Sequence, residues 1–78
     1  MTITSEQVRA ARGLLRWEQK DLAEASGVSL PTIKRLEAIR GPLAAQASTV
    51  DAITKAFDAG GVEFTNGAQP GVRMRKAP

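Results

Sequence analysis

The amino-acid sequence predicts a mainly α-helical protein, a small helical bundle followed by a short C-terminal β-ribbon or strand. Two observations support this fold class. Apolar residues recur at helical spacing between residues 5 and 58, in runs separated by glycine or proline. From residue 62 onward apolar and polar residues alternate, which is typical of a half-buried strand. We expect residues 1–60 to form the helical domain and residues 61–78 to form a C-terminal strand and basic tail.

Length and composition exclude several classes of protein. A chain of 78 residues is one small domain, whose core leaves only a few kcal/mol of stability unless oligomerisation adds more. It has no cysteine and no histidine, which excludes disulfide bonds, thiol nucleophiles and the commonest zinc ligands, so we expect no cofactor. Each carboxylate can be assigned to a helix cap, an ion pair or an exposed face. No acid–base site can therefore be assembled, and we do not expect an enzyme.

The sequence also lacks the features of export or membrane insertion. No apolar run approaches the length of a membrane span, and residues 1–4 lack the charged and apolar regions of a signal peptide. We therefore expect a cytoplasmic protein that does not contact a membrane.

The net charge of +3 is weak support for nucleic-acid binding because of where it lies. Arg73, Arg75 and Lys76 supply all of it, and the other eight basic residues balance the eight acidic residues, all of which precede Asn66. The argument for a nucleic-acid partner must therefore rest on the position of charges and not on their sum.

The first helix is predicted to begin after Thr4. Thr4 and Gln7 have the spacing of a capping box, and Val8 belongs to an apolar stripe on the helix that follows. Gly13 lies inside this helix and costs about 1 kcal/mol relative to alanine, so we expect close helix packing to require it.

Two short helical patterns within residues 19–36 meet at Gly27, which predicts a helix-turn-helix. Glycine ends the first pattern because it can adopt the left-handed conformation without steric cost. Ser29 is the predicted N-cap of the second helix, with its hydroxyl accepting from the N–H of Thr32. The outward face of this second helix is small and basic, which suits the major groove of DNA. Its members are Pro31, Lys34, Arg35 and Ala38.

The same stretch resembles the Cro and phage-repressor class of helix-turn-helix regulators, the xenobiotic-response-element family, over roughly residues 5–58. Family members typically carry a pattern that is matched here by Gln19, Leu22-Ala23, Ser26-Gly27-Val28-Ser29, Thr32-Ile33 and Leu36-Glu37. The resemblance implies a lambda-repressor-like DNA-binding fold and a role in repression. Glu18 departs from the pattern, since the family usually has serine, threonine or asparagine there. A glutamate caps less well and would repel a phosphate.

Seven residues are the candidates for contact with double-stranded DNA. Lys34 and Arg35 are placed to read base edges, and Leu30 to contact a thymine methyl group. We expect the others to lie near the phosphate backbone. These are Gln19, Ser29, Thr32 and Arg40. The alternative is that Lys34 and Arg35 are merely part of a solvated helix face.

Arg12 and Glu37 are predicted to form a structural ion pair. Each lies about 40° from the apolar stripe of its helix, and burial of either charge without a partner is costly. The resemblance agrees, because the family commonly joins its first and third helices in this way. The alternative is that both side chains reach water.

The last helix is predicted to begin at a Ser48 cap, with Asp51 at the third helical position, and to end at Gly60-Gly61. Trp17 is interpreted as a core residue with the spacing of a hydrophobic staple to Leu22, although a role in base stacking is conceivable.

The β-ribbon that follows is expected to join the last helix in a dimer interface, because an isolated hairpin is marginal in water. The interface residues are predicted to be Phe57, Val62, Phe64, Val72 and Met74. The alternative is an intrachain hairpin with a frayed basic end.

Together these patterns predict a sequence-specific DNA-binding transcription regulator that acts as a homodimer on operator half-sites, with repression, often of its own promoter, implied by the resemblance. The alternative function is a protein-interaction module of the antitoxin or anti-activator type, with DNA binding secondary. An exposed C-terminal strand could add to the sheet of such a protein partner.

Overall fold

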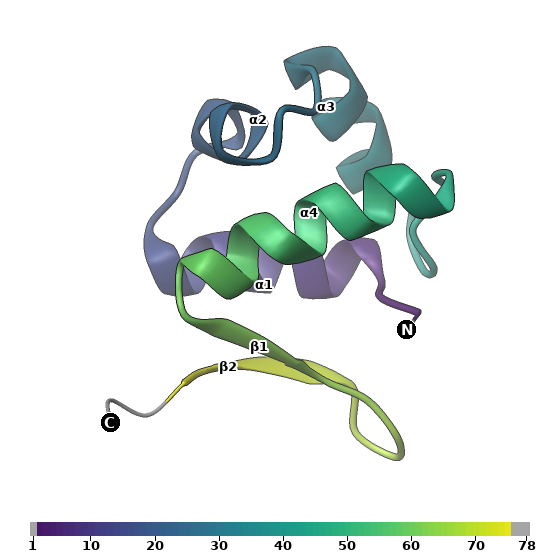
Figure 1. The fold of residues 1–78 in the computed structure, drawn as a ribbon. Coiled ribbons are helices and arrows are strands. Elements are labelled where there is room, and N and C mark those ends of the chain that lie inside the picture. The colour runs from purple at the N-terminus through teal and green to yellow at the C-terminus, as the bar shows by residue number, and fades with distance from the viewer. Residues whose placement is uncertain (1, 76–78) are drawn as a thin grey trace.

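The computed structural model describes residues 2–75, which form four helices and one β-hairpin (Figure 1). The elements are α1 (Ser5–Leu15), α2 (Gln19–Ser26), α3 (Leu30–Ala38), α4 (Ala47–Ala59), β1 (Val62–Thr65) and β2 (Gly71–Met74). The predicted mainly helical fold with a C-terminal ribbon is confirmed. None of the helices within the described residues has the length and apolarity that a membrane span requires. Lys76, to which the sequence assigned tail charge, lies outside the described residues.

The predicted caps of α1 and α3 are present. The Thr4 hydroxyl accepts from the N–H of Gln7 at 3.1 Å, and the Gln7 side-chain oxygen accepts from the N–H of Thr4 at 2.9 Å. At α3 the Ser29 hydroxyl accepts from the N–H of Thr32 at 3.3 Å. Between α2 and α3, Gly27 has a φ of 77°, as the predicted turn requires. The local sequence therefore determines where α1 and α3 begin and where the turn between α2 and α3 lies.

The start of α4 differs from the prediction. The helix begins at Ala47 with Gln46 as N-cap, and the C=O of Gln46 accepts from the N–H of Val50 at 3.0 Å. Ser48 is thus inside the first turn, and Asp51 forms an ion pair with Lys55 at 3.0 Å instead of serving the cap. The extended backbone of Gln46 is enough to start the helix, which no side-chain cap assists. A serine near a helix start does not fix the cap position when the preceding residue is already extended.

One apolar core is shared by the helices and the ribbon. Its fully buried members are Ile3, Val8, Ala11, Leu22, Ile33, Leu36, Ile53, Ala56, Phe57 and Val62. Trp17 packs against this core with its ring stacked on Phe57, at 5.5 Å between centroids, and Phe64 meets Phe57 edge-on at 5.8 Å. The interpretation of Trp17 as a core residue is confirmed.

The ribbon is an antiparallel hairpin that pairs Val62 with Met74 and Phe64 with Val72. Figure 1 shows it on the side of the bundle opposite to α2 and α3. Gln7 fixes its turn end to α1, because the side-chain NH₂ donates to the C=O of Thr65 at 3.0 Å and to the C=O of Gly71 at 3.1 Å. Figure 1 and these bonds show that the hairpin is packed as part of the bundle.

The basic residues of β2 and its end are paired with carboxylates. Arg73 contacts Glu63 at 3.0 Å, and Arg75 contacts Asp58 at 2.7 Å and Glu63 at 3.6 Å. Arg75 also donates to the C=O of Asp58 at 2.8 Å, next to the C-terminal end of α4. These two arginines therefore stabilise the hairpin and its junction with α4, and their charge is compensated locally.

The expectation that close packing requires Gly13 is wrong. A Cβ atom built on Gly13 would meet no heavy atom within 4 Å, whereas one built on Gly60 would lie 2.8 Å from the Leu15 side chain. Gly13 is exposed on α1, so its cost to the helix is not offset by a contact. The close approach occurs at Gly60, where α4 ends above Leu15.

We predict that Gly13→Ala raises the free energy of unfolding by about 0.5–1 kcal/mol, because alanine has the higher helix propensity and meets no clash. Gly60→Ala is the comparison and should gain less stability than Gly13→Ala, since the end of the Leu15 side chain must move to admit the new Cβ atom. Thermal denaturation followed by circular dichroism measures both changes. A lower melting temperature for Gly13→Ala would contradict this account of α1.

Candidate nucleic-acid interface

Helix α3 buries one side and exposes the other, as its sequence predicts. Ile33 and Leu36 are fully buried in the core, whereas Lys34 and Arg35 are exposed. Ser29 is exposed at the N-terminal end of the helix, and Leu30 and Thr32 are half-buried there. The outward surface of α3 is thus a narrow basic ridge on a helix anchored by aliphatic side chains.

Most of the basic side chains in the structure are used in ion pairs. Within residues 2–75, four of them have no acidic partner within 4.0 Å. These are Arg16, Lys34, Arg35 and Arg40. Three of the four lie on α3 or in the two residues after it, and all four are exposed. Uncompensated positive charge is therefore concentrated at α3, although the net charge of residues 1–66 is zero.

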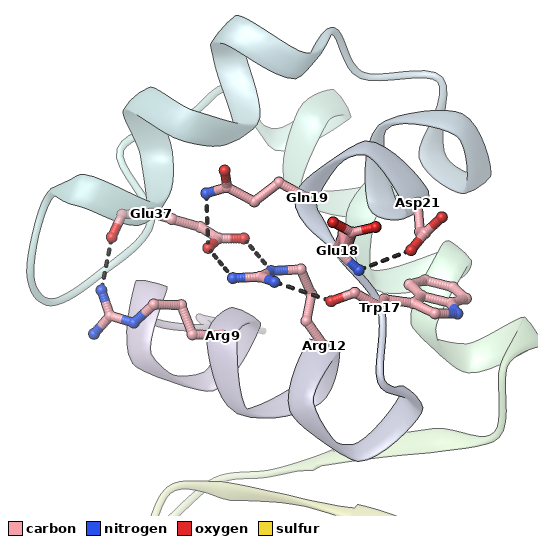
Figure 2. A network of polar contacts seen from close by, with 7 residues as sticks. All are labelled: Arg9, Arg12, Trp17, Glu18, Gln19, Asp21 and Glu37. Carbon is pink, nitrogen blue, oxygen red and sulfur yellow. Dashed lines mark hydrogen bonds and ion pairs between the residues drawn. The ribbon is translucent and has the colours of Figure 1, made fainter.

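A bidentate ion pair between Arg12 and Glu37 joins α1 to α3 (Figure 2). The Arg12 Nε lies 2.8 Å from Glu37 Oε2, and Nη2 lies 2.7 Å from Oε1. The carboxylate is only 4% exposed, and the guanidinium also donates to the C=O of Trp17 at 3.0 Å. The predicted pair is formed, and both charges are satisfied by geometry that suits a planar guanidinium.

Arg9 adds a second contact between α1 and α3 that the sequence did not indicate. Its Nη1 donates to the backbone C=O of Glu37 at 2.7 Å, a carbonyl in the last turn of α3 (Figure 2). Carbonyls at a helix C-terminus lack intrahelical partners, and a cation there also interacts favourably with the helix dipole. The spacing of Arg9 and Arg12, one helical turn apart, was the available signal that both could reach α3.

The start of α2 also contacts the Arg12–Glu37 ion pair. The Gln19 amide donates to Glu37 Oε1 at 3.2 Å, so this NH₂ group is directed inward (Figure 2). At the N-cap, Asp21 accepts from the N–H of Glu18 at 2.8 Å, and Lys20 lies 3.7 Å from the Glu18 carboxylate. Of the seven candidate DNA contacts, three have side chains that already make hydrogen bonds within the chain: Gln19 bonds to Glu37, and Ser29 and Thr32 bond to each other.

The segment after α3 is fixed to the N-terminal end of α1. Thr4 and Pro42 form an isolated antiparallel bridge, and the N–H of Ser5 donates to the C=O of Gly41 at 2.9 Å. The N–H of Gly41 in turn donates to the Glu6 carboxylate at 3.1 Å. Hydrogen bonds from the backbone N–H groups of Glu6 and Gly41 hold the pKa of the Glu6 carboxyl below its ordinary value. Arg40, directly before this segment, therefore stands on a constrained backbone.

The residues predicted for dimerisation fall into two groups. Phe57 and Val62 are fully buried in the chain's own core, and Phe64 and Val72 pack against that core. In this conformation the first two cannot contact a second chain, because the ribbon covers α1 and α4 of its own protomer. Met74 is different, since it is 45% exposed.

We predict that Glu37→Ala lowers the free energy of unfolding by about 3 kcal/mol, because it leaves Arg12 partly buried without a counter-charge. Replacing both residues with methionine should recover much of this loss. Urea denaturation of the single and double variants measures both. If the two single losses simply add in the double variant, the pair does not act as a unit.

The Glu6 contact predicts acid sensitivity of the segment after α3. A lowered pKa in the folded state contributes stability above the unfolded value of 4.5, and this contribution is lost as the pH falls through the folded pKa. The amide resonance of Gly41 should therefore titrate with Glu6 below its ordinary pKa. In Glu6→Gln this titration should be absent, and its persistence would assign it to another group.

Comparison with protein-family models matches residues 8–64 to the helix-turn-helix family of the Cro/C1 type. Comparison with curated proteins and with solved structures gave no match. The family is a DNA-binding regulatory family and not a family of enzymes. The matched residues include all of α2, α3 and α4 and most of α1, so they contain the ion pair and the basic ridge described above. The chain belongs to the Cro/C1-type helix-turn-helix family of DNA-binding proteins.

Proposed function

We propose that the protein is a transcription repressor that binds operator half-sites as a homodimer, with α3 in the major groove. One observation carries this proposal: the basic side chains without an acidic partner within residues 2–75 gather at α3, while those elsewhere, apart from Arg16, are paired. An unpaired basic ridge on a rigid helix is available to guanine and phosphate without first breaking an intrachain contact.

The side chains of α3 divide into two roles. Lys34 and Arg35 point away from the core near the middle of the helix, so we assign them to base edges, where arginine and lysine pair with guanine O6 and N7. Ser29 and Thr32 lie at the N-terminal end of the helix, so we assign them to phosphate, with Leu30 available to a thymine methyl group. Arg40 extends the phosphate contacts past the end of α3.

The N-terminal end of α2 has a smaller part in this proposal. Gln19 donates its NH₂ group to Glu37, so it can meet a phosphate through its backbone N–H. Glu18 and Asp21 place negative charge beside that position, offset by Lys20. We therefore assign most of the phosphate attraction to Arg40 and to the start of α3.

Dimerisation follows from the small number of contacts that one protomer can make. Each bidentate base contact adds about 1–3 kcal/mol of discrimination, and a neutral bundle adds little phosphate attraction. Dimers of helix-turn-helix proteins bind half-sites one helical turn apart, roughly 34–36 Å, so that both recognition helices enter the major groove on the same side of the DNA. Two recognition helices would double the base contacts.

The direct experiment is footprinting of the purified protein on the DNA upstream of its own gene. A protected site with two symmetric halves would support binding as a dimer to its own promoter. Absence of binding to any duplex at moderate salt would overturn the proposal and favour a protein-interaction module instead.

We predict that Arg35→Ala weakens operator binding by about 1–3 kcal/mol and relaxes sequence choice at one position of each half-site. Lys55→Ala is a matched control, because it removes the same charge from an exposed side chain on α4 that is paired with Asp51. Titration of operator and mutated operators by fluorescence anisotropy measures both variants. Equal losses for the two would mean that Arg35 supplies charge alone and does not read a base.

A further inference from the structure

The C-terminal end of α1 carries a side chain in a backbone conformation that favours glycine. Arg16 has a φ of 55° and a ψ of 38°, which lie in the left-handed region. Within residues 2–75 four other residues have a positive φ, between 77° and 91°, and all four are glycines. Arg16 is therefore the one position in the described chain where a side chain is kept in this conformation. Strained residues of this kind cluster at functional sites.

The fold itself makes no use of the Arg16 side chain. It is exposed, and no acidic group lies within 4.0 Å of it among residues 2–75. A cation at the end of a helix interacts favourably with the helix dipole, but Arg12 already supplies one in the last turn of α1. The cap is made by the backbone, since the N–H of Arg16 donates to the C=O of Gly13 at 3.2 Å. Neither an ion pair nor the cap therefore requires an arginine.

Arg16 lies close to the helix that meets the DNA backbone in a helix-turn-helix. It stands three positions before Gln19, the first residue of α2. In such motifs the first helix crosses the phosphate backbone while the second lies in the major groove. Here those two helices are α2 and α3.

The backbone next to Arg16 is held in a fixed position relative to α3. The Arg12 guanidinium donates to the C=O of Trp17 at 3.0 Å and, with its other nitrogens, to the carboxylate of Glu37 at 2.7 and 2.8 Å (Figure 2). One side chain thus joins the residue after Arg16 to the recognition helix. An anion bound by Arg16 would therefore lie in a defined register with the side chains of α3.

The start of α2 needs additional positive charge if it is to approach a phosphate. The Glu18 carboxylate is exposed at the N-cap and Asp21 lies in the first turn, while Lys20, 3.7 Å from Glu18, offsets only one of these two charges. The remaining negative charge repels a phosphate from this helix end. With Arg16 included, residues 16–21 hold two basic and two acidic side chains, so the repulsion is offset.

We propose that Arg16 binds a DNA phosphate beside the start of α2, and that the chain keeps an arginine there although glycine would make α1 more stable. A guanidinium suits this role because it can donate two parallel hydrogen bonds to one phosphate. Phosphate contacts position a protein on the duplex and carry no base information. Arg16 therefore adds affinity and fixes register without changing sequence choice. This inference rests on the DNA binding of the proposed function and adds a contact to it.

The proposal predicts that stability and DNA binding change in opposite directions in Arg16→Gly. Glycine relieves the left-handed conformation, so the melting temperature should rise by about 4 °C. Circular dichroism at moderate salt measures this change, because salt screens the competing interaction with the helix dipole. A lower melting temperature would mean that the arginine serves the fold, and would overturn the proposal.

The binding measurement uses two duplexes of equal length, one from the region upstream of the protein's own gene and one of random sequence. Fluorescence anisotropy over a range of salt should show Arg16→Gly weakened by the same factor on both. Loss of one phosphate contact lowers the slope of log K against log salt by about one per protomer. A fourfold rise in salt should therefore cost the variant about threefold less affinity per protomer than the wild type. An unchanged slope, or a loss confined to one duplex, would overturn the proposal.

Three further variants separate the charge from other effects. Arg16→Lys keeps the charge and the strain, so it should keep the salt slope and gain no stability. Arg16→Asn tolerates the left-handed conformation without the flexibility of glycine, and should bind DNA as weakly as Arg16→Gly. Lys55→Ala is the matched control, because it removes one exposed positive charge from α4. Equal losses for Lys55→Ala and Arg16→Gly would assign the effect to net charge and overturn the contact.

The outcome for the wild-type protein distinguishes this inference from the proposed function. If the wild type binds duplex DNA and Arg16→Gly has the same salt slope, the proposed function stands and this contact is refuted. If the wild type binds neither duplex, both are refuted, whatever the melting temperatures.

Discussion

The orientation of the recognition helix depends on one buried carboxylate. Glu37 accepts two bonds from Arg12 and one from Gln19, and its backbone C=O accepts from Arg9. Three helices thus converge on a single residue near the end of α3. A buried pair of this kind adds little net stability compared with apolar residues of the same shape, but breaking it is costly, since a charge is then left buried without a partner. The main consequence of the ion pair is therefore geometric, because it fixes the orientation of α3 and so the direction in which Lys34 and Arg35 project from the surface.

The same helix that fixes α3 also fixes the ribbon. From the N-terminal part of α1, Gln7 reaches two carbonyls at the turn end of the hairpin, while Glu6 holds the backbone of Gly41 after α3. From the middle of α1, Arg9 and Arg12 reach Glu37. α1 is therefore the helix that fixes the position of the basic ridge relative to the hairpin. The two are held on opposite sides of the bundle by contacts from one rigid element.

The sequence predicts this fold well wherever the signal is local. The cap at Thr4, the turn at Gly27 and the alternation from Val62 depend on residues a few positions apart, and all were found as expected. The Arg12–Glu37 pair was also predictable, because each charge stands at the edge of an apolar stripe and needs a partner. At the candidate interface the exposure of Lys34 and Arg35 follows from helical periodicity alone.

The features that could not be predicted depend on three-dimensional proximity. Nothing local distinguishes Gly13, which has open space beside it, from Gly60, which a side chain 45 positions earlier in the chain approaches closely. The start of α4 was misplaced because the extended backbone of Gln46, and not a polar side chain, ends the preceding loop. Periodicity identified Phe57 and Val62 as apolar but could not say whether their own chain or a second one would cover them.

The distribution of free positive charge also could not be predicted from the composition, because it depends on which charges are paired in the structure. The surplus of three positive charges lies in the C-terminal tail, yet Arg73 and Arg75 are paired with Glu63 and Asp58. At α3 the reverse holds. Residues 1–66 have zero net charge, yet Lys34 and Arg35 on this helix have no carboxylate within 4.0 Å among residues 2–75. The positive charge that is not compensated by a nearby carboxylate therefore lies mainly at α3, and the charges of Arg73 and Arg75 are compensated. An anionic partner attracted by this molecule would meet its free charges at α3, on the side of the bundle opposite to the ribbon (Figure 1).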